Sequence, residues 1–174
     1  SDHGQEEVIP YQIEYGEKID NAVKKVFHGL FPSEEFKATV AAQGPVGFIY
    51  PHRELNSAEK EKAAQALALE ARIPLVLASI ENKIFAFSGR EKFSLPEEIS
   101  KVAGEHHPYL EEVGEELEDL CRHKDSGSFV ICGWRREERS ISFPMEYGSH
   151  AGPGPHETDG FVLMPADIRV NTQG

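Results

Sequence analysis

Two short stretches at opposite ends of the sequence carry residues that can bind a divalent metal ion. The chain opens with Ser1-Asp2-His3-Gly4, and near its far end it reads Gly148-Ser149-His150-Ala151-Gly152. Carboxylate oxygens and imidazole nitrogens are the ligands of divalent metals in many hydrolases. The flanking glycines permit the sharp turns that bring neighbouring side chains to one ion. We therefore expect Asp2, His3 and His150 to belong to one metal site.

Each half of this pattern also has a simpler interpretation. An Asp-His-Gly tripeptide is typical of a surface turn at a chain terminus, and His150 alone could be a solvated loop residue. His156, Glu157 and Asp159 follow in the same loop. They could orient the imidazole ligands through hydrogen bonds, but for these three we favour ordinary polar loop residues.

Composition narrows the classes of function. The chain has 174 residues and a formal net charge of -12, with 30 acidic against 18 basic residues. A protein that binds the nucleic-acid backbone needs a basic surface, so we expect no such binding. Two cysteines, Cys121 and Cys132, are too few for a disulfide scaffold and are expected to be buried, inert thiols.

The sequence also bears on location. No apolar run approaches the roughly 20 residues that span a bilayer, so we expect no membrane segment. The compartment cannot be read from the sequence, although a soluble, cytoplasmic protein is favoured. The absence of an initiator Met predicts that the chain begins inside a longer protein.

Periodicity predicts alternating helices and strands, and therefore a single α/β domain over residues 1–174. A continuous apolar run, as in residues 128–134, is typical of a strand covered on both faces. We expect a mixed, mostly parallel sheet with helices on both faces. The expected helices are residues 18–30, 58–71 capped by Ser57, 94–103 opened by a Ser94–Glu97 capping box, and 108 onward; the expected strands are 36–41, 46–50, 75–80, 83–87, 128–134, 140–143 and a final buried strand at 161–164.

Three other groups have predominantly structural interpretations. His106 and His107 precede a helix, where adjacent side chains diverge, so a shared metal ion is disfavoured. The run of acidic residues at 111–119 is expected to be a solvated helix face, with a partner-binding strip as the alternative. Arg135, Arg136 and Arg139 could bind a substrate phosphate, but a charged hairpin turn is favoured, because Glu137 and Glu138 interrupt them.

The Ser-Asp-His-Gly turn, the distant Gly-Ser-His-Ala-Gly loop and the apolar run Phe161-Val162-Leu163-Met164-Pro165 together resemble the alkaline phosphatase superfamily. They look most like its type I phosphodiesterase/nucleotide pyrophosphatase branch. The resemblance implies that Asp2 and His3 hold one metal ion and His150 a second, with zinc favoured and manganese possible. Family loops often read His-Gly-Gly, whereas this chain has His150-Ala151-Gly152.

The resemblance covers the two ends of the chain and leaves residues 15–125 as the place for inserted or cap elements. Family members also carry a Ser or Thr nucleophile, an early metal-binding Asp and an Asp-x-x-x-His pair. None of these can be placed on this chain, which starts at the Asp-His turn. The resemblance thus implies the C-terminal part of an alkaline phosphatase-like core, from a metal-dependent hydrolase of small phosphate esters. A self-contained α/β binding or protein-interaction domain without catalysis is the alternative.

Overall fold

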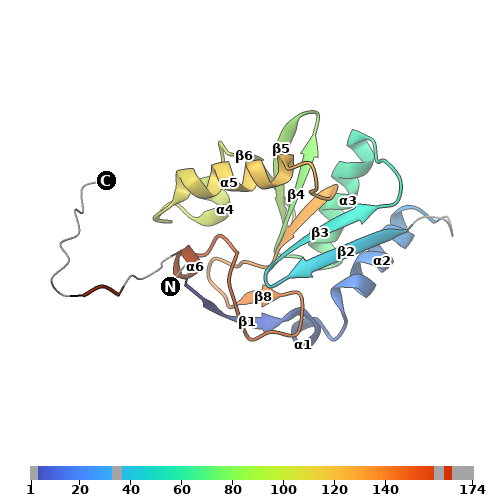
Figure 1. Ribbon diagram of the computed structural model, residues 1–174. Helices are drawn as coiled ribbons and strands as arrows, with labels where there is room; N and C mark the ends of the chain where they lie inside the picture. Colours follow the sequence, from blue (N-terminus) through green and yellow to red (C-terminus); the bar gives the residue numbers. More distant parts are fainter. Residues whose placement is uncertain (1–3, 33–36, 159–162, 166–174) are drawn as a thin grey trace.

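The computed structural model describes residues 4–32, 37–158 and 163–165, which form two sheets and their covering helices (Figure 1). The strands are β1 (Glu6–Pro10), β2 (Ala38–Gln43), β3 (Val46–Pro51), β4 (Leu75–Ile80), β5 (Lys83–Ser88), β6 (Glu91–Leu95), β7 (Phe129–Cys132), β8 (Ser140–Ser142) and β9 (Gly148–Ser149). The helices are α1 (Tyr11–Tyr15), α2 (Ile19–Leu30), α3 (Ser57–Leu69), α4 (Ile99–Ala103), α5 (Leu110–Arg122) and α6 (Pro155–Thr158).

The larger sheet has six strands in the order β2-β3-β7-β4-β5-β6, and every neighbouring pair is antiparallel. The prediction of a mixed, mostly parallel sheet is therefore wrong. Two-residue turns join β2 to β3, β4 to β5 and β5 to β6, whereas a parallel connection needs a crossover of a dozen or more residues. The turn between β4 and β5 places Glu81 and Asn82 at φ 51° and 64°, the conformation of a tight hairpin turn.

The position of β7 explains why the sequence looked parallel. The segment β3-α3-β4 is a strand–helix–strand unit, and its two strands do run in the same direction because both pair antiparallel with β7. However, β7 comes from much later in the chain and lies between them. The unit is split by a strand that no local pattern could place.

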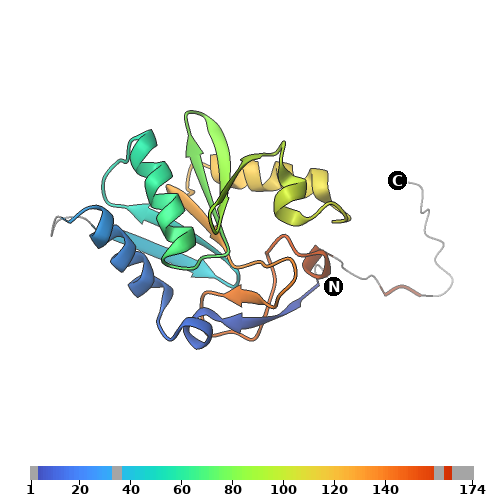
Figure 2. The ribbon, with the colours of Figure 1, turned by 180° about the vertical axis from the view of Figure 1, so that it is seen from behind.

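Helices cover both faces of this sheet, as predicted (Figures 1 and 2). Along β7, Phe129 and Ile131 pack in one buried cluster with α2 and α3, while Val130 and Cys132 pack in the other with α4 and α5. All four residues are buried. This two-sided burial is why the strand reads as an unbroken apolar run.

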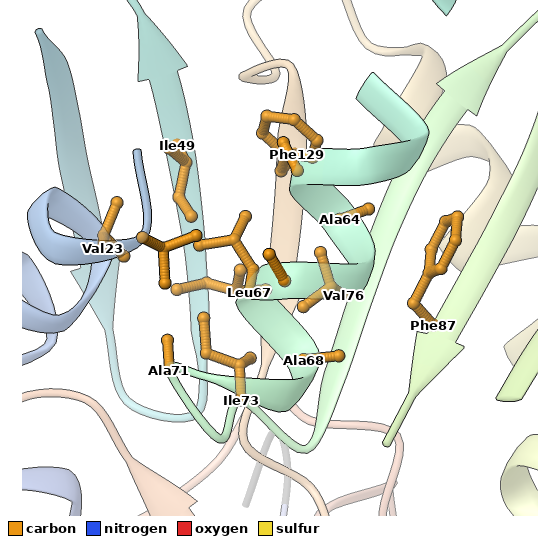
Figure 3. Packing of buried hydrophobic residues seen from close by; sticks show 14 of the residues in the cluster. Val23, Ile49, Ala64, Leu67, Ala68, Ala71, Ile73, Val76, Phe87 and Phe129 are labelled. Atoms are coloured by element: carbon orange, nitrogen blue, oxygen red, sulfur yellow. The ribbon is translucent and has the colours of Figure 1, made fainter. Parts of the chain in front are cut away.

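The first cluster is centred on α3, whose small residues let it lie close to the strands (Figure 3). Leu67 is fully buried between β3, β4, β7 and α2, with Val76 and Ile49 among its cluster neighbours. Ala64 and Ala68 on the same helix are also buried. The helix begins with a capping box between Asn56 and Glu59, so Asn56, not the predicted Ser57, is the N-cap.

The smaller sheet has the order β8-β1-β9, with β1 parallel to β8 and antiparallel to β9. It adjoins the larger sheet where the amide of Ile141 donates to the Gly133 carbonyl at 2.7 Å, and the amide of Phe143 to the Gly44 carbonyl at 2.9 Å. A Cβ on Gly133 would lie 2.0 Å from the Ile141 carbonyl oxygen. Glycine at this position therefore permits the junction that fixes β1 and its neighbours.

Two predicted elements differ in the structure. Ser94 and Glu97 do not form the predicted capping box: Ser94 Oγ donates to Glu97 Oε2 at 2.9 Å, while the Ser94 amide donates to Glu98. Ser94 belongs to β6, and the helix starts at Ile99. The final buried strand is not supported: residues 163–165 are not in a strand, and Leu163 is 91% exposed. Phe161 and Val162 lie outside the described residues.

The exposed face of α5 is acidic, as predicted, with Glu111, Glu112, Glu115 and Glu116 in solvent. Its opposite face buries Val113 and Leu117 against the sheet. Among all the residues that the structure describes, no helix has the length and apolar character needed to cross a bilayer.

Candidate metal centre

The two segments that flank the predicted metal ligands lie side by side. Strand β1 begins two residues after Gly4 and pairs with β9, where Glu6 opposes Ser149 and Glu7 opposes Gly148. The amide of Gly4 donates to the carbonyl of Glu157 at 3.0 Å. Both ribbon views show the start of β1 beside α6 (Figures 1 and 2).

The predicted site residues themselves divide into two groups. Asp2, His3 and Asp159 lie outside the described residues. His150 is exposed immediately after β9, His156 is exposed on α6, and Glu157 is buried. Within residues 4–32, 37–158 and 163–165, no three His, Cys, Asp or Glu side chains are grouped to hold a metal ion. Of the three predicted ligands, His150 lies within these ranges.

The loop after His150 is tightly curved. Ala151 has φ of 80°, a left-handed conformation that favours glycine. The resemblance implies a glycine at this position. Ala151 has a left-handed backbone conformation, which is the one that glycine adopts most easily. A Cβ on Gly152 would lie 2.6 Å from Oε1 of Glu157, and one on Gly154 would lie 2.4 Å from Oε1 of Glu6. These two glycines therefore let the buried carboxylate of Glu157 and the half-buried carboxylate of Glu6 approach the loop backbone.

Glu157 supplies the acceptor at the centre of this loop. Its Oε2 accepts a hydrogen bond from the amide of Gly152 at 2.6 Å, and the side chain is only 5% exposed. Burial raises the pKa of the Glu157 carboxyl to about 7; the Gly152 hydrogen bond opposes this rise and the charge of Glu6 adds to it. The polar loop residue favoured by the sequence is thus a buried group that organises the loop.

His107 holds the loop from the other side, a role that the sequence did not predict. Its Nδ1 accepts from the amide of Tyr109 at 3.2 Å, so the ring proton is on Nε2, which donates to the carbonyl of Pro153 at 2.7 Å. The ring also meets Trp134 edge-on, with 6.4 Å between centroids. His106 is exposed, so the two adjacent imidazoles diverge as expected.

An open cleft of ≈ 1110 Å³ lies beside these segments. Its lining includes Gln5 from the first segment and His156 from the last loop, together with Trp134 and Arg136. His150 does not line this cleft; it lines a separate hollow that also includes Gln5, Gly44 and Ser149. The larger cleft has room for a small organic molecule.

The arginines at the cleft are paired in a charged turn, but this turn is not the predicted hairpin, because the strands β7 and β8 that it joins belong to different sheets. Arg135 lies 3.4 Å from Glu14 and 3.2 Å from Glu138 and also bonds the Tyr15 hydroxyl. Arg139 lies 3.0 Å from Glu7. Their charges are thus largely satisfied within the chain.

The cysteines have no place in this site. Cys132 is buried and Cys121 is partly buried. Burial raises the pKa of each thiol to about 12, which disfavours the reactive thiolate. The burial of Cys132 and the partial burial of Cys121 agree with the expectation of buried or inert thiols.

The chain was compared with protein families, curated proteins and solved structures. No family model matches it, and no curated protein or solved structure does so either.

Proposed function

We propose that this chain is the C-terminal part of a metal-dependent phosphodiesterase or phosphatase that hydrolyses small phosphate esters. The candidate ligands are Asp2, His3 and His150. The main support is that β1 pairs with β9 and that the Gly4 amide bonds the Glu157 carbonyl, which brings the segments next to these residues together. A carboxylate and two imidazoles are donors that suit zinc, with manganese as a weaker fit. The nucleophilic Ser or Thr lies outside this chain in this proposal.

The residues of the chain have separable roles in the proposed enzyme. Asp2 and His3 would hold one divalent ion, and His150 would hold a second. Two such ions supply charge that stabilises the attacking and leaving oxygens during displacement at phosphorus. Glu157 and His107 hold the backbone around Gly152 and Pro153, and so hold the loop that carries His150.

The cleft beside the two segments offers a place for the organic group of the ester. Trp134 contributes an apolar wall, and Gln5 and His156 contribute polar groups from the two segments that carry the candidate ligands in the sequence. Since the chain is acidic overall, bound dications would also offset the repulsion of an anionic substrate.

The test is hydrolysis by the complete enzyme that contains this chain. Bis(p-nitrophenyl) phosphate, p-nitrophenyl phosphate and p-nitrophenyl sulfate distinguish diester, monoester and sulfate ester activity. We expect chelation to abolish turnover, zinc to restore it, and His150→Ala to lower kcat/KM at least a hundredfold. His28→Ala, an exposed histidine on α2, should leave turnover unchanged.

The isolated 174 residues should behave differently, because they hold only part of the site. We expect weak or no zinc binding by calorimetry and no turnover of any of the three esters. Tight stoichiometric zinc uptake or robust hydrolysis by this chain alone would contradict the division of the site proposed above. Full activity of His150→Ala in the complete enzyme would favour the alternative of a non-catalytic binding domain.

A further inference from the structure

One residue, Glu157, is bonded to both candidate ligand segments. Its backbone carbonyl accepts from the amide of Gly4, the residue next to His3, at 3.0 Å. Its side-chain Oε2 accepts from the amide of Gly152, two residues after His150, at 2.6 Å. A single residue in α6 therefore contacts the backbone beside each half of the proposed site.

The side chain of Glu157 is fixed by close packing. It is 5% exposed, and Oε1 lies 2.6 Å from where a Cβ on Gly152 would stand and 3.0 Å from that position on Gly154. Glu6 of β1 also approaches this loop. Its Oε1 lies 2.4 Å from where a Cβ on Gly154 would stand. The carboxylate of Glu157 is thus enclosed by the loop and has little freedom to adopt another rotamer.

The loop between these contacts is held at a third point. His107 donates from Nε2 to the carbonyl of Pro153 at 2.7 Å, between Gly152 and Gly154 in the sequence. Gly152 is bonded to a buried side chain of α6, and Pro153 to a buried side chain of the α4–α5 connection, so the loop after His150 is fixed relative to both. A shift of Glu157 would therefore be transmitted to both the Gly4 end and the His150 end.

We propose that Glu157 is a positioning residue that couples the backbone at Gly4, which follows the candidate ligands Asp2 and His3 in the sequence, to the loop that carries His150. Its role toward metal ions rests on the proposed function, whereas its coupling of the two backbone segments does not. Side chains that orient metal ligands without touching the ion typically change metal affinity 10- to 100-fold when removed.

The first arm of the test measures the coupling in this chain by amide hydrogen exchange. Glu157→Ala removes the carboxylate, and Glu157→Gln keeps an acceptor for Gly152 in a side chain of similar shape. We expect the amides of Gly152 and Gly4 to exchange at least about tenfold faster in Glu157→Ala. In Glu157→Gln both should stay within about threefold of the wild type, while Ile131 in the core stays protected in both variants.

The second arm measures zinc affinity of the complete protein by competition with a chelator. We expect Glu157→Ala to weaken zinc binding by about 10- to 100-fold and Glu157→Gln to restore most of it. Glu118→Ala is the matched control, since this carboxylate pairs with Arg122 on the surface of α5 at 2.6 Å. It should change neither exchange nor zinc affinity.

The outcomes separate the two proposals. Faster exchange at Gly152 with unchanged exchange at Gly4 would overturn the coupling, because Glu157 would then support only its own loop. Zinc binding by the wild type that is equally tight in Glu157→Ala would overturn the positioning role while leaving the proposed function intact. A complete protein that binds no zinc would overturn the proposed function and, with it, the role toward metal, although exchange would still report the coupling.

Discussion

The imidazole of His107 donates to the carbonyl of Pro153 across 2.7 Å and so ties the turn before α5 to the loop that carries His150. His107 is 9% exposed. This bond joins residues from the α4–α5 connection to a loop that also contacts the first strand. The last loop is therefore held from the second core cluster as well as from β1.

We expect His107→Ala to destabilise the fold by about 2 kcal/mol, because it leaves a buried carbonyl without its donor. His106→Ala provides the matched control, since the neighbouring histidine is exposed and should cost less than about 0.5 kcal/mol. Urea unfolding of both variants measures the difference. Equal stability of the two would show that the His107–Pro153 bond does not hold the loop.

The ionisation of Glu157 predicts a pH-dependent stability. Its pKa in the folded state is about 7 against an ordinary 4.5, so between these values the folded protein keeps a proton that the unfolded chain has released. Stability from this group is therefore fully present below about pH 4.5 and is lost as pH rises through 7. Above pH 7 the folded state bears the full free-energy cost of burying the charged Glu157 carboxylate.

Glu157→Gln should remove this dependence. The unfolding free energy of the variant minus that of the wild type should increase by on the order of 2 kcal/mol from pH 5 to pH 8. Glu116→Gln, which removes the same charge from the exposed face of α5, should show no comparable gain. A wild type and Glu157→Gln variant that differ by the same amount at both pH values would contradict the buried carboxylate described here.

The core around α3 gives a second matched pair. Leu67 is fully buried, whereas Leu69 on the same helix is 42% exposed. We expect Leu67→Ala to cost about 3 to 4 kcal/mol, through lost burial and the cavity left behind, and Leu69→Ala about 1 kcal/mol. Thermal and urea unfolding check both values. Similar losses for both would mean that α3 presents a different face to the sheet.

Local patterns predicted the elements that depend on local interactions. The spacing of Ile19, Val23 and Phe27 identified α2, and the apolar pattern of residues 75–87 identified the β4–β5 hairpin. The predicted Ser94–Glu97 capping box is wrong: the two side chains bond each other, but the Ser94 amide bonds Glu98 and the helix begins at Ile99.

Non-local pairing is what the sequence could not supply. The insertion of β7 between β3 and β4 joins distant parts of the chain, and it changes the sheet from parallel to antiparallel without altering any single strand's pattern. The contact of His107 with Pro153 is likewise long-range. The spacing of Gly152 and Gly154 did carry a signal for close backbone approach, but it could not identify Glu157 and Glu6 as the groups that approach.

The most direct test of the proposed metal centre is anomalous X-ray scattering at the zinc edge, from crystals of the complete enzyme grown with zinc. We expect two peaks about 4 Å apart, one bound by Asp2 and His3 and the other by His150. Crystals of His150→Ala should lose the second peak. Zinc bound elsewhere, or Asp2 and His3 placed far from His150 with no ion between them, would contradict the proposed metal centre.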